Sequence, residues 1–238
     1  MRKSLSKTLD LARSTRRCVS RIRRGPSICA RRIAWVAGGG ILLTIAGLAL
    51  GQATPDTSIA RRAETLAVNR CASCHVPGGV GADPRIPQIG GQQRDYIEVQ
   101  LRAFRNKNRA DPDAHDAMWP VSAGLNDELI SALAEYFAQQ PPAMGRFGRG
   151  DAAQIAAGKR LYRSGDRARG IAACSACHGI DAEGQSVVPR LAGQHATYLT
   201  IQMQAIQGRL RQSIVMHGVI RDLSIADMEV LALYLESL

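Results

Sequence analysis

An internal repeat constrains this chain more than any other feature of its sequence. A C-A-S-C-H segment at residues 71–75 returns as C-S-A-C-H at residues 174–178. Downstream of each, a Pro-x-Ile/Leu-x-Gly-Gln segment occurs at 87–92 and again at 189–194. A tyrosine, a Met–Leu spacing and a closing amphipathic segment then recur in the same order. Motifs that return in a fixed order indicate a duplicated structural unit, so the sequence predicts two similar domains.

A linker rich in proline and glycine separates the two copies. Residues 139–150 contain a Pro-Pro pair and three glycines, which break helical periodicity. We therefore expect a leader at 1–53, a first domain at 54–140 and a second domain at 141–238. Apolar residues recur at helical spacing near the end of each copy, and no stretch alternates as a strand would. The predicted fold class is therefore all-α.

The net charge of +11 is concentrated in the leader. Residues 1–53 hold eleven of the 31 Lys and Arg residues but one of the 20 Asp and Glu residues, so residues 54–238 carry a net charge of +1. A protein that neutralises phosphates needs a basic surface, and the predicted domains have almost no excess of positive charge. The charge distribution therefore argues against nucleic acid as a partner.

The leader joins its basic residues to an uncharged, apolar stretch at residues 33–51. Such a stretch behind a positive flank is either a signal peptide or a membrane anchor. In both cases the positive-inside rule keeps the flank in the cytoplasm and sends the rest of the chain across the membrane. We expect a periplasmic protein that is either soluble after cleavage or anchored to the inner membrane by this helix, and both interpretations stay open.

The repeated C-x-x-C-H motif is the strongest chemical signal in the sequence. Two thiols three positions apart can add to the two vinyl groups of one haem, and the adjacent histidine can then ligate the iron. A redox-active C-x-x-C pair would not need this histidine in both copies. A zinc site would need further ligands, which the other histidines do not supply at matching positions. The motif predicts two covalent c-type haems, attached through Cys71, Cys74, Cys174 and Cys177 and ligated by His75 and His178.

The second axial ligand of each iron is expected to be a methionine. Met118 and Met216 occupy equivalent places in the repeat, each before the last amphipathic segment. A thioether suits iron and raises its reduction potential, although methionine also serves as an adaptable filler of apolar cores. His115 and His217 lie close by, but they flank their methionines on opposite sides and do not form a repeat pair.

Two prolines are candidates for a supporting role. Pro87 follows His75 by twelve residues. Pro189 follows His178 by eleven residues. A ligating imidazole usually donates its other N–H to an acceptor that fixes the ring, and the carbonyl of each proline is a candidate for that acceptor. A turn-forming role explains the prolines equally well, so the sequence leaves both roles open.

These motifs together resemble class I cytochromes c, and their tandem arrangement resembles the dihaem cytochrome c4 family. The resemblance covers residues 58–238. It implies two cytochrome c domains, each wrapped around one haem, with His/Met ligation of both irons. It also implies that the first and last helices of each domain cross closely at a small residue, and Ala63 and Gly158 match that place. The first domain departs from the pattern, because a longer loop precedes its methionine and Trp-Pro follows it.

Electron transfer is the function that this resemblance implies. The expected partners are membrane respiratory complexes, with a reductase or dehydrogenase as the donor and a terminal oxidase as the acceptor. One alternative is a haem-bearing subunit of a dehydrogenase complex, which would use the same residues. Another is a dihaem enzyme such as a peroxidase or a sulfur-compound oxidase. Catalysis at iron needs an open coordination position, and a methionine is available to each haem, so we expect an electron carrier rather than an enzyme.

Overall fold

The computed structural model of the chain describes residues 57–76, 83–145 and 150–238. The leader at 1–53, with the expected signal or anchor helix at 33–51, lies outside the described residues. Within them the structure is helical, and the only β-pairing consists of isolated bridges. No helix of this described part is long and apolar enough to cross a membrane. The predicted all-α fold class is confirmed.

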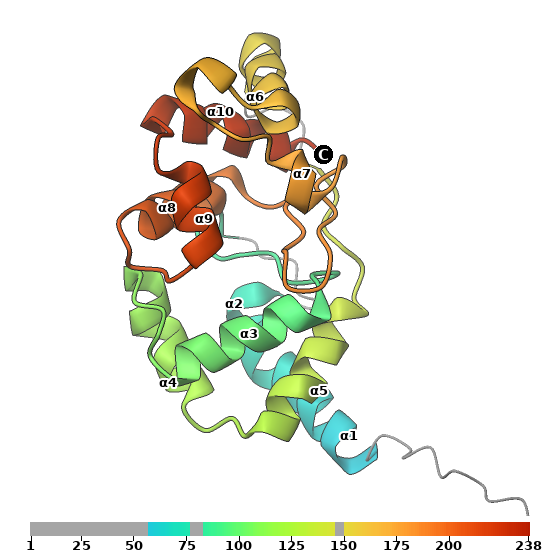
Figure 1. The fold of residues 1–238 in the computed structure, drawn as a ribbon. Coiled ribbons are helices and arrows are strands. Elements are labelled where there is room, and N and C mark those ends of the chain that lie inside the picture. The colour runs from blue at the N-terminus through green and yellow to red at the C-terminus, as the bar shows by residue number, and fades with distance from the viewer. Residues whose placement is uncertain (1–56, 77–82, 146–149) are drawn as a thin grey trace, which may run out of the picture. The chain divides into compact units, whose positions relative to one another are not determined.

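The helices of the first domain gather around their own core (Figure 1). The final helix of this domain begins where the side chain of Asn126 accepts a hydrogen bond from the backbone N–H of Leu129 at 3.0 Å, as an N-cap residue does. One face of that helix then buries Leu129, Ile130 and Leu133 in the core. The elements are α1 (Thr57–Leu66), η1 (Ala67–Cys71), α2 (Ala72–His75), α3 (Arg94–Arg105), η3 (Ala114–Met118), α4 (Trp119–Ser122) and α5 (Asp127–Ala138).

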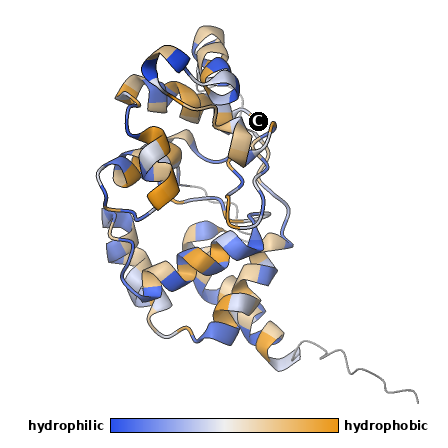
Figure 2. Cartoon of the chain, viewed as in Figure 1, coloured by the Kyte–Doolittle hydropathy of each residue, from blue (hydrophilic) through white to orange (hydrophobic). Residues whose placement is uncertain are grey.

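The second domain has a separate core and a similar order of helices. Its first helix begins with a capping box between Asp151 and Gln154, and its last begins with one between Ser224 and Asp227. Figure 2 shows hydrophobic and hydrophilic residues side by side along the helices, as expected for helices that bury one face. The elements are α6 (Ala152–Ser164), η4 (Arg167–Arg169), α7 (Ser175–His178), α8 (Ala196–Gln207), α9 (Ile214–Ile220) and α10 (Ile225–Glu236).

The first and last helices of each domain pack against each other, α1 on α5 and α6 on α10. Gly158 in α6 lies so close to α10 that a β-carbon placed on it would be 2.0 Å from the carbonyl oxygen of Val230. The matching residue in α1 is Ala63, which is buried in the core of the first domain. Glycine therefore occupies this position in the second domain, where the two helices approach so closely that they leave no room for a side chain.

A group of buried and half-buried polar side chains lies between the two domains, and we call it the arginine cluster. Arg109 donates to the Asp111 carboxylate at 2.7 Å and to Gln202 of the second domain at 2.7 Å. Arg211 donates back to Gln100 of the first domain at 3.1 Å. The contacts between the domains are thus reciprocal, so the interface follows the duplication. The members of the cluster are Tyr96, Gln100, Arg109, Asp111, Tyr198, Gln202 and Arg211.

The carboxylate of the arginine cluster stays ionised although it is buried. Burial alone would raise the pKa of Asp111, but the charge and hydrogen bond of Arg109, with a further hydrogen bond from Gln202, outweigh that effect and hold the pKa below its usual value. The ionised carboxylate offsets part of the positive charge that the two arginines bring into the interface.

Candidate functional site

Both C-x-x-C-H motifs lie at short helices, α2 and α7. Helical residues i, i+3 and i+4 lie on one face, so the two thiols and the imidazole of each motif project from the same side. Both histidines are buried, the first cysteine of each motif is half-buried and the second is exposed. Each site therefore presents two thiols beside one shielded imidazole. None of the four motif cysteines is in a disulfide bond: Cys71, Cys74, Cys174 and Cys177.

Each motif histidine forms a hydrogen bond with the carbonyl oxygen of a proline. His75 Nδ1 lies 2.9 Å from Pro87 O, and His178 Nδ1 lies 3.0 Å from Pro189 O. A carbonyl only accepts, so the proton is on Nδ1 and the lone pair of Nε2 remains for a metal. Burial lowers the pKa of both histidines, against a smaller rise caused by the proline carbonyls, so both rings are neutral at pH 7. Neutral imidazole is the form that ligates iron.

The first thiol of each motif lacks the electrostatics of a redox-active nucleophile. Burial raises the pKa of Cys71, and it raises that of Cys174 to about 11. Thiol–disulfide enzymes need the opposite shift, because the thiolate is the nucleophile. The raised pKa values therefore argue against the redox-active interpretation of the motif. As for zinc, the described residues include no group of three or more His, Cys, Asp or Glu side chains placed to hold a metal ion.

Met118 and Met216 are both half-buried, and each lies in a helical segment ahead of the last helix of its domain. Met118 is the final residue of η3. Met216 lies in the first turn of α9, where the Ser213 side chain accepts a hydrogen bond from its backbone nitrogen at 3.4 Å. Met216 also packs against the core of the second domain. The two methionines thus occupy comparable places in the two domains.

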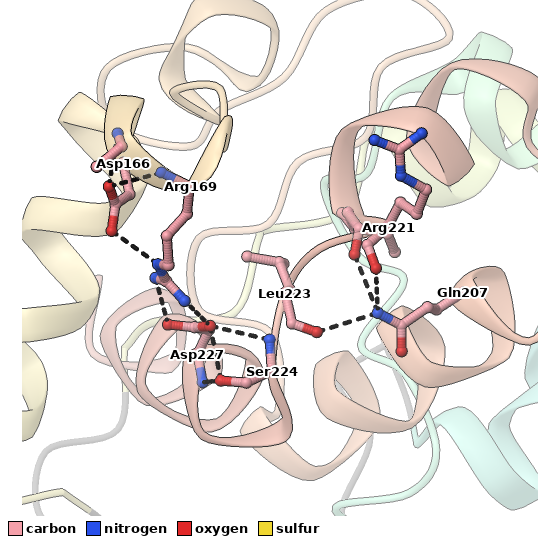
Figure 3. Close-up of polar contacts among 9 residues, drawn as sticks. Asp166, Arg169, Gln207, Arg221, Leu223, Ser224 and Asp227 are labelled. Carbon is pink, nitrogen blue, oxygen red and sulfur yellow. Dashed lines mark hydrogen bonds and ion pairs between the residues drawn. The ribbon is translucent and has the colours of Figure 1, made fainter.

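Side chains from two other segments hold the turn between α9 and α10 (Figure 3). Arg169 of η4, just before the second motif, donates to both carboxylate oxygens of Asp227 at 2.7 and 2.9 Å, a strong bidentate geometry. This pair joins the motif loop to α10, so the α9–α10 turn is held from two directions. From the end of α8, Gln207 Nε2 donates at 3.2, 2.9 and 3.0 Å to the carbonyl oxygens of Ile220, Arg221 and Leu223.

The histidines that neighbour the two methionines have other partners. His115 Nδ1 lies 2.6 Å from the carboxylate of Asp116, and its ring meets that of Trp119 edge-on with 4.5 Å between the centroids. His217 Nδ1 lies 3.1 Å from the carbonyl oxygen of Ile206. These different surroundings agree with the absence of a repeat relation between the two histidines.

The sequence does not predict two features of these sites. Ile214 and Val215, which precede Met216, are 96% and 70% exposed. Gln92 and Gln194 are buried and bond to the backbone of the opposite domain. The recurrence of both glutamines in the repeat is a signal that they matter, but their partners depend on contacts between the domains.

Comparison with known proteins identifies the family. The family model described as cytochrome c matches twice, at residues 60–141 and 155–238. Cytochrome c-552 of Acidithiobacillus ferridurans is 36% identical over 171 residues, which cover 71% of this chain and 73% of that protein. Cytochrome c4 of Thiocapsa roseopersicina is 33% identical over 192 residues, which cover 78% of this chain and 96% of that protein. This chain belongs to the cytochrome c4 family. The crystal structure of reduced recombinant cytochrome c4 from Pseudomonas stutzeri matches with a TM-score of 0.65 at 28% identity, covering 78% of this chain and 100% of that structure.

Membership of the cytochrome c4 family confirms several of the expectations from sequence. The chain has two tandem cytochrome c domains, binds two covalent c-type haems and transfers electrons. The domain boundaries at residues 53 and 140 stay predictions, as do the individual ligand roles.

The residues of both sites fit a covalent haem. Each site supplies two cysteines on one helix face for the two vinyl groups, and an imidazole whose Nε2 is available to iron. When bound, each haem supplies a one-electron Fe(III)/Fe(II) couple. A porphyrin also presents a broad apolar face, which suits exposed aliphatic side chains. Such side chains occur close in sequence to His178 and Met216: Ile180, Val187, Ile214 and Val215.

Proposed function

We propose that the two haems of this chain are held by the motif residues, and that the protein carries single electrons between respiratory complexes. In each domain two cysteines form the thioether bonds, a histidine and a methionine ligate the iron, and a proline carbonyl fixes the imidazole. In the first domain these are Cys71, Cys74, His75, Met118 and Pro87. In the second domain they are Cys174, Cys177, His178, Met216 and Pro189.

The paired histidine–proline hydrogen bonds support this proposal most directly. They occur at 2.9 and 3.0 Å in two domains whose sequences differ at most positions. In both, they leave Nε2 as the free nitrogen of a buried ring, which is the arrangement that a metal-ligating histidine needs. A proline that only formed a turn would not require a contact with the motif histidine.

The methionine available to each haem supports the electron-carrier role. Catalysis at iron requires an open or displaceable ligand position. Met118 and Met216 fill that position in the proposed arrangement, and both stand at comparable places before the last helix. We therefore infer that the protein carries electrons and is not a peroxidase or a sulfur-compound oxidase.

The proposed partners are membrane respiratory complexes, with a reductase or dehydrogenase as donor and a terminal oxidase as acceptor. The basic flank and the apolar stretch at 33–51 support export of both domains to the periplasm. There the protein is either released by cleavage or held at the inner membrane by that stretch.

A dehydrogenase acceptor is a second candidate for the physiological role. A relative from Thiomonas intermedia (strain K12) is named thiosulfate dehydrogenase electron acceptor; it is 31% identical over 177 residues, which cover 74% of this chain and 75% of that protein. In this role the chain would receive electrons from a partner dehydrogenase through the same two haem sites. Rapid reduction of the ferric protein by thiosulfate and a purified thiosulfate dehydrogenase would favour this role, and failure to be reduced would remove it.

Covalent attachment is tested by extraction and by mutation. Both haems of the purified protein should stay with the polypeptide through acid–acetone extraction, because thioether bonds are covalent. Changing Cys174 and Cys177 to alanine should leave one haem per chain, and the same change at Cys71 and Cys74 is the matched variant. Two haems per chain after either double substitution would contradict the assignment.

A further inference from the structure

Gln194 of the second domain reaches into the first domain beside Pro87. Its Oε1 accepts a hydrogen bond from the backbone N–H of Gln88 at 2.9 Å, and its Nε2 donates to the carbonyl oxygen of Gln88 at 2.8 Å. The same Oε1 accepts from the backbone N–H of His195 at 3.1 Å, which fixes the direction of the amide. Gln194 and Gln88 are both buried. The side chain of Gln194 thus clamps the residue that follows the proline.

Gln92 makes the same contact in the opposite direction. Its Oε1 accepts from the backbone N–H of Arg190 at 2.7 Å, and its Nε2 donates to the carbonyl oxygen of Arg190 at 2.9 Å. Its Oε1 also accepts from the next backbone N–H, that of Gln93, at 2.9 Å. Gln92 and Gln194 are equivalent in the repeat, and so are the backbone segments that they hold. The same donors and acceptors therefore form this contact in both directions across the interface.

The clamped N–H belongs to the same peptide group as the carbonyl that holds the motif histidine. The peptide unit between Pro87 and Gln88 is planar and conjugated. Its carbonyl accepts from His75 Nδ1, and its N–H donates to Gln194. A hydrogen bond at one end of a peptide group polarises it and strengthens the bond at the other end. A continuous chain of polarised bonds therefore runs from Gln194 to the imidazole of the other domain.

We propose that Gln92 and Gln194 are positioning residues through which each domain tunes the haem iron of the other. A stronger acceptor on Nδ1–H makes an imidazole a better donor to iron, and a more basic ligand favours the ferric state. Gln194 therefore lowers the reduction potential of the first-domain haem, and Gln92 lowers that of the second-domain haem. This inference rests on the proposed ligand roles of His75 and His178.

The test compares the glutamine variants Gln194→Leu and Gln92→Leu in the full-length protein with both haems bound. Two readouts are used: the Nδ1–H resonances of His75 and His178 in the diamagnetic ferrous protein, by NMR, and the potential of each haem, by spectroelectrochemical titration. Gln93→Leu is the matched control, because Gln93 Nε2 also donates across the interface, to Glu183 O at 2.9 Å, but to no peptide next to a proline.

Gln194→Leu should move the His75 resonance upfield and leave that of His178 in place. It should raise the first-domain potential so that the ferrous-to-ferric ratio at fixed ambient potential rises about twofold, the order expected when one hydrogen bond weakens by roughly 10–30%. At 59 mV per tenfold change this is about 18 mV. Gln92→Leu should do the same to His178 and the second-domain haem, and Gln93→Leu should change neither.

Equal changes in both domains from either variant, or no change from both, would overturn the proposal. Gln194→Met and Gln92→Met keep an unbranched side chain of similar volume and replace the leucine variants if those do not fold. Failure of the tuning can be told apart from failure of the proposed ligand roles. In the first case the spectra still report two His/Met haems, and in the second the wild-type protein itself lacks histidine-ligated iron.

Discussion

Replacing Gly158 with alanine should destabilise the second domain, although alanine is the better helix former. Gly158 lies inside α6, where the exchange would by itself stabilise the helix by about 0.5–1 kcal/mol. The added β-carbon, however, would lie 2.0 Å from the carbonyl oxygen of Val230 and 2.8 Å from the β-carbon of Tyr234. Both atoms belong to α10, so the clash can be relieved only if the two helices separate.

The cost of that separation sets the size of the effect. Overpacking a core typically costs about 1–3 kcal/mol, and the upper end applies because a backbone carbonyl cannot rotate away as a side chain can. Subtracting the gain in helix propensity leaves a net loss of about 2 kcal/mol. In a chain of this length that loss lowers Tm by about 4–8 °C.

Thermal unfolding of the ferric protein with both haems bound, followed by far-ultraviolet circular dichroism, measures this shift. Gly218→Ala is the matched control, because Gly218 also lies inside a helix, α9, and a β-carbon there meets nothing within 4 Å. The control should keep its Tm or raise it by a few degrees, in line with a gain of about 0.5–1 kcal/mol. A Gly158→Ala protein as stable as the wild type would refute the argument that the backbone approach excludes a side chain.

Two other substitutions test the site and the interface. Met216→Ala should keep both haems and open one iron to carbon monoxide. It should also lower the reduction potential of that haem by roughly a tenth of the ~0.8 V range that axial ligands span. Stoichiometric carbon monoxide binding at both irons of the ferrous wild type would contradict the ligand role. Asp111→Asn should reduce the free energy of unfolding by about 3–5 kcal/mol at neutral pH, because Arg109 and Arg211 lose a buried counter-charge. The folded state holds the pKa of Asp111 below its unfolded value of 3.8, so its contribution is fully present above about pH 5 and is lost as the pH falls through the folded-state pKa. In urea titrations from about pH 7 to pH 3, the difference between wild type and variant should therefore shrink, and a difference that is constant with pH would speak against the ionised pair.

Features that depend on neighbours along the chain could be predicted from the sequence. The capping boxes of α6 and α10 follow from side chains three residues apart, Asp151 with Gln154 and Ser224 with Asp227, and both are present. The spacing within the C-x-x-C-H motifs likewise places thiols and imidazole on one helical face without any knowledge of the rest of the fold. The prediction of a close helix crossing at Gly158 came from the family resemblance, because no local sequence pattern marks that crossing.

Features that depend on how the domains meet could not be predicted in this way. Arg109 and Gln202 are far apart in sequence, and a buried arginine looks the same as an exposed one until its partners are known. Nor does any local signal show that the Gln194 side chain leaves its own domain to bond with Gln88. The buried position of these polar groups results from docking, and docking depends on surfaces assembled from many segments.

The duplication nevertheless accounts for the form that the docking takes. When equivalent surfaces of two similar domains face each other, each contact across the interface is repeated in the opposite direction by the equivalent residues. Arg109 thus meets Gln202 while Arg211 meets Gln100. The exception lies two residues after each arginine, where the first domain has an aspartate, Asp111, and the second has Ser213. Because the first domain supplies the carboxylate of the arginine cluster, while Ser213 instead caps α9 ahead of the proposed methionine ligand, the acid-side pH dependence of this cluster should follow Asp111 rather than a symmetric pair of carboxylates.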